Sequence, residues 1–354
     1  MQFSRVALLT ASSLLPFLTL AAACGSSDAP GPGGAGGAAG AGGATTSGPG
    51  PGSSTSTGDF DAGAKITTIA RSMIPDTVQP GKENTQCITV NLNNPEGAYV
   101  VRVRSDLSAG SHHMVVYTSN KTVEDPVPKN CQPFNGILNG EHPIFIAQQP
   151  QASLSFPTDE NGTPVGFEIP PHQMVKIEMH YIDTSQFPLS VMGKISLDTV
   201  PLSTKVTRSD LAFWGTTQIN IPANSTGDTG VLYQHALAGT KTFALTTHQH
   251  QLGTEMLVWY GDSANDPNKM MVADGKSWSD PPVELFAKPL DFPTNGNSTL
   301  STKGLAFECK WNNTTPNTVK FGEGFNDEMC FVWQYYFPSQ GFQVCVDGFC
   351  NKTP

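Results

Sequence analysis

The chain has 354 residues, a formal net charge of −10, 35 glycines and 28 prolines. Only 14% of the residues are charged, and no cluster of lysine and arginine is present, which excludes the electrostatic footprint of a nucleic-acid-binding protein. The low charge content and the many turn-forming residues favour a β-rich, loop-rich protein over a helical one.

Residues 1–23 have the organisation of a lipoprotein signal peptide. Arg5 precedes an apolar stretch, residues 6–20, which is too short to span a bilayer. Three alanines then lead to Cys24, as in a bacterial lipobox, in which the cysteine becomes the acylated first residue. The alternative is an ordinary cleavable signal peptide with an incidental cysteine. We expect an exported protein, lipid-anchored at Cys24 in the bacterial outer membrane and otherwise without membrane contact.

Residues 24–63 consist largely of Gly, Ala, Ser, Thr, Pro and Asp. Such a segment cannot bury enough apolar surface to offset the loss of conformational entropy on folding. The sequence therefore predicts a flexible, disordered tether between the anchor and the folded part.

The remainder of the chain predicts an all-β fold with no amphipathic helix. Short runs of β-branched and aromatic residues are separated by Gly, Pro, Asn and Asp; examples are residues 98–104, 114–117, 174–179, 193–197 and 242–246. This pattern is typical of antiparallel β-sandwiches. The stretch 199–204, which contains Pro201, is a plausible junction, so we expect one sandwich over 64–200 and a second over 201–354.

Five of the eight histidines fall in three compact groups: His112 with His113, His180, and His248 with His250. Residues i and i+2 on a strand share a face, so His248 and His250 can reach one metal ion, although such a pair alone more often belongs to a polar face. His112 and His113 point to opposite faces of a regular strand. They can bind one ion only if the backbone is bulged there; otherwise one histidine is buried and the other exposed.

A fourth motif makes the pattern specific. Glu328-Met329-Cys330 precedes the aromatic run 331–337. The order His-His-Met, His-Tyr-x-Asp, His-x-His and Glu-Met-Cys resembles that of the copper type II, ascorbate-dependent monooxygenases, the relatives of peptidylglycine α-hydroxylating monooxygenase and dopamine β-monooxygenase. The resemblance covers most of residues 80–340.

The resemblance implies two jelly-roll-like β-sandwich domains with one copper ion each. The first ion would be held by His112, His113 and His180, and the second by His248, His250 and Met329. Three imidazoles suit an electron-relay site, whereas the soft thioether favours Cu(I) at an open, catalytic site. The implied activity is hydroxylation of a C–H bond of a small molecule by O2, with ascorbate or another reductant as electron donor, in a chain that we expect to be a monomer.

The resemblance also implies a disulfide bond between Cys309 and Cys330, next to the methionine ligand. The six cysteines that follow Cys24 allow 15 pairings, and spacing alone does not choose among them. With Cys309 and Cys330 paired, proximity and elimination suggest Cys345–Cys350 and Cys87–Cys131.

The chain departs from the family at the substrate. Members that act on peptides grip a carboxylate with an Arg, an Asn and a Tyr; the corresponding positions here are Thr246, Phe331 and Trp333. These residues cannot form a bidentate carboxylate clamp. Phe331 and Trp333 share a strand face, so they either line an apolar substrate pocket or belong to the core of the second sandwich.

Two other functions remain open at this point. A cell-envelope copper carrier or sensor would keep the ligands and lack substrate-dependent O2 consumption. A structural or adhesion protein with chance histidines would not bind copper at a stoichiometry near two.

Overall fold

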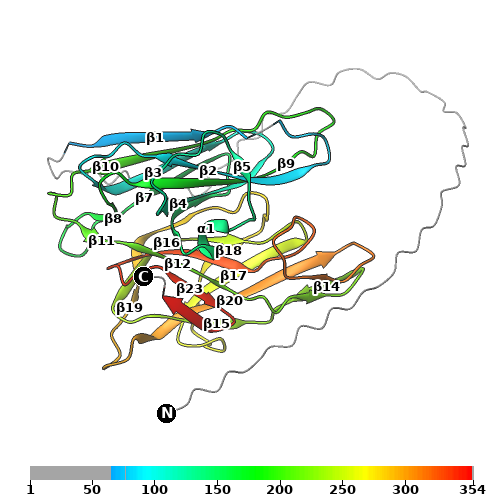
Figure 1. The fold of residues 1–354 in the computed structure, drawn as a ribbon. Coiled ribbons are helices and arrows are strands. Elements are labelled where there is room, and N and C mark those ends of the chain that lie inside the picture. The colour runs from blue at the N-terminus through cyan, green and yellow to red at the C-terminus, as the bar shows by residue number, and fades with distance from the viewer. Residues whose placement is uncertain (1–64, 76, 353–354) are drawn as a thin grey trace, which may run out of the picture. The chain divides into compact units, whose positions relative to one another are not determined.

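The computed structural model describes residues 65–75 and 77–352, so the predicted signal peptide, Cys24 and the tether through residue 63 lie outside the described residues. The described part is almost entirely β-structure, which confirms the all-β prediction (Figure 1). Its only helix is the short α1 (Asn135–Leu138). No helix within the described ranges has the length and apolar character needed to cross a membrane.

The strands up to residue 208 form two sheets. Their bounds are β1 (Thr67–Met73), β2 (Glu83–Asn91), β3 (Ala98–Leu107), β4 (Ser111–Ser119), β5 (Lys129–Asn130), β6 (His142–Ala147), β7 (Gln151–Ser155), β8 (Val165–Ile169), β9 (Met174–Ile182), β10 (Gly193–Val200) and β11 (Thr207–Arg208). The outer N-terminal sheet has the order β1-β10-β3-β8-β11, with β7 also paired to β3. The inner N-terminal sheet has the order β5-β2-β9-β4-β6.

The strands from residue 210 onward form the remaining sheets. Their bounds are β12 (Asp210–Gly215), β13 (Asn220–Ile221), β14 (Ser225–Asp228), β15 (Leu232–Leu237), β16 (Thr240–His248), β17 (Gly253–Gly261), β18 (Met270–Gly275), β19 (Glu284–Phe292), β20 (Leu300–Asn313), β21 (Val319–Lys320), β22 (Phe331–Phe337), β23 (Gln343–Val346) and β24 (Phe349–Lys352). The inner C-terminal sheet has the order β19-β16-β22-β12-β23-β24. The outer C-terminal sheet has the order β14-β20-β17-β18, with β15 also paired to β20, and β13 pairs with β21.

Within the described ranges, no strand before residue 209 pairs with one after it. We refer to the two sets as the N-terminal and C-terminal halves. The described residues nevertheless all belong to one compact unit, and the division into domains at residue 201 stays a prediction. The five strand runs expected from the sequence all lie within observed strands: β3, β4, β9, β10 and β16.

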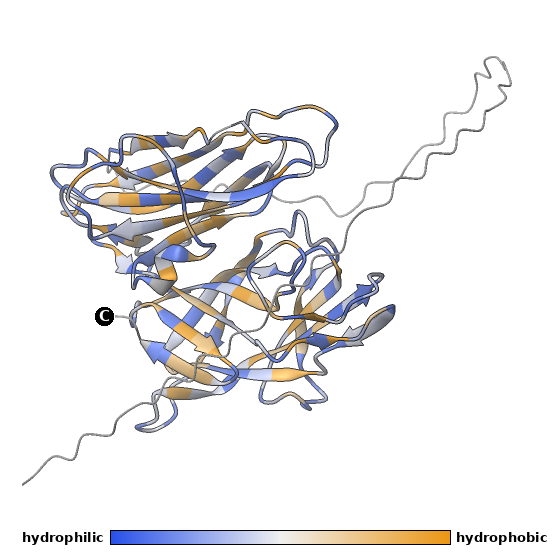
Figure 2. Cartoon of the chain, turned by 45° about the vertical axis from the view of Figure 1, so that its right-hand side comes forward, coloured by the Kyte–Doolittle hydropathy of each residue, from blue (hydrophilic) through white to orange (hydrophobic). Residues whose placement is uncertain are grey.

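Hydrophilic and hydrophobic residues alternate along many of the strands (Figure 2), and the buried apolar residues form two hydrophobic cores. On β12, Phe213 belongs to one core and its neighbour Trp214 to the other, because successive side chains point to opposite faces. The first core fills the N-terminal half and continues onto the inner C-terminal sheet through Phe331, Trp333 and Tyr335. The two inner sheets therefore pack on each other, and β4, β9, β12 and β22 are buried on both faces.

The inner N-terminal sheet turns a buried polar face toward the C-terminal half. On β9, Met179 faces the outer N-terminal sheet, where its sulfur lies against Gly193. Glu178 and His180 lie on the other side of the pleat and are buried. Polar groups buried between two sheets need partners or a ligand, so this face is where a functional site is expected.

Three disulfide bonds stabilise the fold: Cys87–Cys131, Cys309–Cys330 and Cys345–Cys350. All three pairings expected from the sequence are confirmed.

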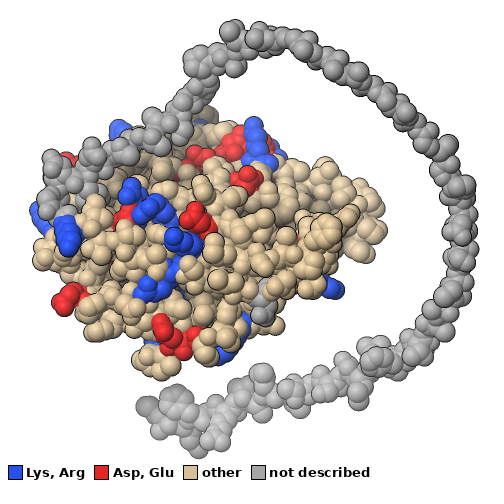
Figure 3. Space-filling view, turned by 90° about the horizontal axis from the view of Figure 1, so that it is seen from above, with Lys and Arg blue, Asp and Glu red and all other residues tan. Residues whose placement is uncertain are grey.

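On the face in Figure 3, charged side chains of both signs are scattered over a mainly uncharged surface.

Candidate metal centre

Three of the predicted ligands lie on neighbouring strands of the inner N-terminal sheet. His113 on β4 is the register partner of His180 on β9, and the register shifts between Ser111 and His113. This irregularity is the bulge that two adjacent histidines require in order to face one ion. One ring nitrogen from each of His112, His113 and His180 lies within 4.8 Å of the others, and all three side chains are buried.

The other two histidines lie at the end of β16. His248 is the last residue of the strand, and His250 is in the following turn. The spacing of the pair predicted that both histidines lie on one regular strand, and they do not. Their ring centroids are 5.3 Å apart. The carboxylate of Glu328 accepts hydrogen bonds from the backbone N–H groups of His250 (3.1 Å) and Leu252 (2.7 Å), which fixes the turn.

The two sets of histidines adjoin. The ring centroid of His248 is 5.3 Å from that of His113 and 6.2 Å from that of His112, and the His112 and His250 centroids are 6.4 Å apart. The sequence assigned each set to its own sandwich and gave no reason to expect contact. The contact arises because both sets lie on the faces by which the two inner sheets pack together.

The residues fit a metal ion by two criteria. The buried histidine nitrogens without a hydrogen-bond partner among the described residues are Nε2 of His112, both ring nitrogens of His113, Nδ1 of His180, and Nε2 of His248 and His250. Buried polar atoms without partners are costly, and a metal ion would satisfy them. Burial also lowers the pKa of His112, His113 and His248 well below the ordinary value, and that of His250 to about 4. These four rings are therefore neutral, with lone pairs available for coordination.

Hydrogen bonds at the far side of three rings orient these nitrogens. Nδ1 of His248 lies 2.5 Å from Oε1 of Gln148, and Nδ1 of His250 lies 3.1 Å from the carbonyl oxygen of Asp327. Because both partners are acceptors, Nδ1 carries the proton and Nε2 is left free for a metal. His180 is the converse case, since its Nε2 lies 3.3 Å from Glu83 and its Nδ1 is free. The hydrogen bond between Glu83 and His180 lowers the pKa of the Glu83 carboxyl group.

Met329 lies two residues before the start of β22 and is buried in the core shared by the two halves. Its neighbour Cys330 is bonded to Cys309 on β20, and its other neighbour Glu328 also accepts a hydrogen bond from the indole of Trp311 (2.8 Å). Burial raises the pKa of Glu328 to about 7. The backbone on either side of Met329 is thus held, as a ligand position requires.

The residues expected at the substrate have defined surroundings. The hydroxyl of Thr246 accepts a hydrogen bond from Nε2 of Gln148 (3.1 Å). Phe213 stacks on Phe331, with ring centroids 4.6 Å apart, and contacts Trp333 at 4.5 Å. Phe331 and Trp333 are buried between the inner sheets and belong to the first core, whereas the alternative assignment placed them in the core of the second sandwich. Their contact with a substrate stays a prediction.

Three residues near the histidines were not identified from the sequence: Gln148, Phe134 and Trp278. Gln148 follows β6 and bonds to the C-terminal half, Phe134 packs against His113 and His248, and Trp278 lies 5.4 Å from His112 between ring centroids. Each reaches the site from a loop distant in sequence, and no local motif marks any of them.

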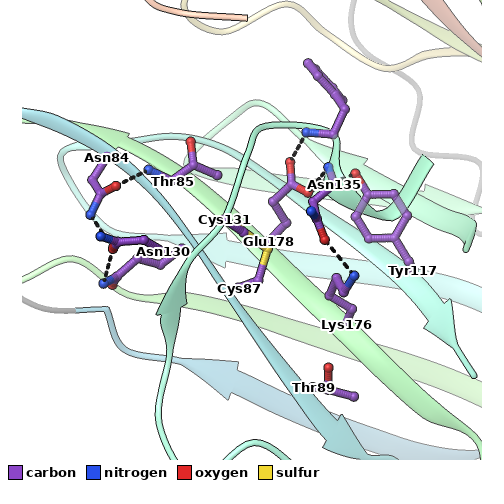
Figure 4. The surroundings of a disulfide bond; sticks show 12 residues. Asn84, Thr85, Cys87, Thr89, Tyr117, Asn130, Cys131, Asn135, Lys176 and Glu178 are labelled. Atoms are coloured by element: carbon purple, nitrogen blue, oxygen red, sulfur yellow. Dashed lines mark hydrogen bonds between the residues drawn. A yellow bond between two sulfur atoms is a disulfide. The ribbon is translucent and has the colours of Figure 1, made fainter. Parts of the chain in front are cut away.

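Cys87, Cys131 and Glu178 form a second group with metal-ligand atoms close together. The two cysteines are bonded to each other and so do not offer thiolates. This group is structural (Figure 4).

Comparison with known proteins bears on the C-terminal half. Residues 229–353 match the family model of the copper type II ascorbate-dependent monooxygenase C-terminal domain. The match contains His248, His250 and Met329; the other three predicted ligands precede it. No curated protein sequence matches the chain.

Solved structures with some likeness include the major capsid protein P2 from bacteriophage PM2, at 12% identity and a TM-score of 0.28 over 77% of this chain and 97% of that one. The recombinant peptide:N-glycanase F structure gives 9% identity and a TM-score of 0.27 over 72% and 98%. Scores this low carry no argument about fold or function. From the match of residues 229–353 and the histidine and methionine motifs within it, this part of the chain is similar to the C-terminal domain of the copper type II, ascorbate-dependent monooxygenases.

Proposed function

We propose that the protein is a copper-dependent monooxygenase that hydroxylates a C–H bond of a small organic substrate with O2 and an external reductant. The observation that carries the proposal is the set of five buried imidazoles, drawn from both halves, whose free nitrogens point to a metal site. The family match adds copper and ascorbate as the expected cofactor and reductant.

In this proposal His112, His113 and His180 hold one copper ion, and His248, His250 and Met329 hold the other. Copper bound at these residues supplies one-electron chemistry and activation of O2. The protein's own contribution is to keep the imidazoles of His112, His113, His248 and His250 neutral by burial and to fix which nitrogen of His248 and His250 is free. Burial of the site also restricts the access of water, which limits unproductive oxidation.

The substrate is proposed to be apolar or aromatic and to lack a carboxylate that must be clamped. Thr246, which stands at the family's arginine position, has a neutral hydroxyl already bonded to Gln148. Phe331 and Trp333, at the family's polar positions, offer only ring surfaces and one indole N–H. A cation that could pair with a carboxylate is therefore missing from these three positions.

A copper carrier or sensor is the second candidate. The same replacement of the substrate residues favours it, because a carrier needs the ligands without a substrate clamp. A carrier would bind Cu(I) tightly and remain inert toward O2 in the presence of reductant and substrate.

Oxygen uptake separates the two candidates. Copper-loaded protein is given ascorbate and a panel of small aromatic, amide and aliphatic substrates, and product is identified by mass spectrometry. We expect substrate-dependent uptake in the wild type and its loss in Met329→Ala, which should keep the fold and most of the copper because a thioether is a weak ligand. If no substrate stimulates uptake in the wild type and Met329→Ala alters only Cu(I) affinity, the carrier function is favoured.

His113→Ala is the complementary variant. It removes a ligand from the N-terminal set and should abolish turnover by cutting the electron supply, while the ion at His248 and His250 is still bound. Retained turnover in this variant would contradict the assignment of His113 to the electron-relay site.

We further propose that the protein is exported, acylated at Cys24 and carried as a monomer on the bacterial outer membrane, with the segment to residue 63 as its tether. Small-molecule substrate and O2 are its proposed partners, and nucleic acid is not among them. The sequence features of residues 1–63 and the acidic composition support these proposals.

A further inference from the structure

The ring of Phe134 lies between one histidine of each half. It stacks on His113 with a centroid distance of 5.5 Å and an interplanar angle of 18°. It meets His248 nearly edge-on, at 5.7 Å and 82°. Phe134 therefore contacts a predicted ligand of each copper ion with a single side chain.

The C-terminal half closes around the same ring. Phe213 on β12 lies 5.8 Å from Phe134 between ring centroids, and Trp333 on β22 lies 6.0 Å away. With these neighbours the side chain is almost fully buried. A displaced ring would leave a void between the two sets of histidines.

The backbone of Phe134 is held in an unusual conformation. Its φ of 54° and ψ of 26° lie in the left-handed region, which is unfavourable for a residue with a Cβ. The carboxylate of Glu178 accepts the backbone N–H of Phe134 at 2.6 Å and that of Asn135 at 3.0 Å. These two hydrogen bonds to a buried carboxylate offset the unfavourable conformation and fix the direction in which the ring leaves the loop.

The disulfide bond ties the start of the same loop to the same point of the sheet. Cys131, three residues before Phe134, is bonded to Cys87 on β2, and Cys87 is the register partner of Glu178 on β9. Figure 4 shows the disulfide, Glu178 and Asn135 gathered around this position. The Asn135 side chain additionally accepts a hydrogen bond from Lys176 (2.9 Å). Two anchors on adjacent strands thus fix the loop.

We propose that Phe134 is a positioning residue that holds His113 and His248 at a fixed distance and mutual orientation, and that Glu178 and the Cys87–Cys131 disulfide bond keep it in place. The inference rests on the proposed function only in taking these histidines as copper ligands. Its role is mechanical: the ring fills the space between the two ligand sets, excludes water from it and limits the rotation of both imidazoles. No sequence motif marks Phe134.

The test compares Phe134→Ala and Phe134→Leu with Phe145→Ala in the full chain. Phe145 is an equally buried aromatic residue of the inner N-terminal sheet whose ring contact is with Tyr335 and not with a histidine. In the apoprotein, the ring resonances of His113 and His248 are followed by NMR. In the Cu(II)-loaded protein, the electron paramagnetic resonance parameters and the dipolar coupling between the two ions are measured.

We expect Phe134→Ala to shift and broaden the resonances of both histidines, to change the dipolar coupling and to lower Cu(I) affinity roughly tenfold, which corresponds to about 1.4 kcal/mol. The loss of the two ring contacts, with His113 and with His248, is the reason for this change. Phe134→Leu keeps apolar volume and should restore part of the affinity. Phe145→Ala should lower stability without altering either histidine or the coupling.

The disulfide gives an independent test. Cys87→Ser with Cys131→Ser should reproduce the spectroscopic changes of Phe134→Ala, whereas Cys345→Ser with Cys350→Ser, which removes the disulfide of the β23–β24 hairpin, should not. The inference is overturned if Phe134→Ala leaves the histidine resonances and the coupling as in the wild type, or if Phe145→Ala changes them equally. If wild-type protein binds no copper, the proposed function fails, and the apoprotein resonances still decide the role of Phe134.

Discussion

Gln148 offers the sharpest test of how the two halves form one site. It follows β6 in the N-terminal half and makes three hydrogen bonds to the end of β16: Nε2 donates to the carbonyl oxygen of Thr247 (2.8 Å) and to the hydroxyl of Thr246 (3.1 Å), and Oε1 accepts from Nδ1 of His248 (2.5 Å). All four residues are buried. Gln148→Leu keeps the size of the side chain but removes every one of these bonds.

The expected loss follows from the groups left without partners. The backbone carbonyl of Thr247 and the ring Nδ1–H of His248 are buried and cannot reach water. Each unsatisfied buried group costs ~1–3 kcal/mol. The Thr246 hydroxyl can rotate toward another acceptor, so we count two groups and expect a loss of about 3 kcal/mol in the free energy of unfolding. Because His248 is a proposed copper ligand, loss of its orienting partner should also lower copper affinity by about 10- to 100-fold.

Urea unfolding of the apoprotein gives the first quantity, and competition with a Cu(I) chelator gives the second. Gln149→Leu is the matched control, because Gln149 is only partly buried and makes a single hydrogen bond, to the carbonyl oxygen of Asp280 (3.2 Å). This control should change both quantities little. A loss of stability in Gln148→Leu no larger than that in Gln149→Leu, with unchanged copper affinity, would refute the reasoning.

Three further predictions concern other parts of the chain. Metal analysis of the wild-type protein should give two copper ions per chain. His248→Ala should remove one ion and weaken the binding of the other, since the His113 ring is 5.3 Å from that of His248. Loss of both ions would contradict the two-site assignment. Cys24→Ser should release the protein from the membrane fraction or block its maturation, and unchanged fractionation would exclude the lipid anchor. Burial disfavours ionisation of Asp125, but hydrogen bonds from Lys121 and Lys129 outweigh it and lower its pKa from 3.8 to about 2. The carboxylate therefore stabilises the fold above pH 3.8 and loses this effect as the pH falls toward 2. The stability difference between wild type and Asp125→Asn should shrink over that range in thermal unfolding, and a constant difference would contradict the assignment.

The sequence was sufficient for the fold class because the period-2 pattern is local. The runs at 98–104 and 242–246 each contain the alternation that a strand needs, and both lie within strands of the structure. The ligand candidates were also identifiable, because metal binding requires residue types that are scarce in this chain, and five of its eight histidines occur in tight groups. The disulfide pairings followed from a family resemblance together with proximity along the chain.

Only the tertiary structure showed that His113 and His248 lie side by side, because their contact depends on how two inner sheets pack on each other. The same holds for Gln148, which reaches a histidine from a loop of the other half. It also holds for Phe134, which reaches the histidines from a loop beside a disulfide bond. The pattern of residues along a chain records which face of each strand is buried. It does not record which buried face meets which, since any apolar face can cover another, and that choice is made by shape and hydrogen-bond complementarity over the whole interface.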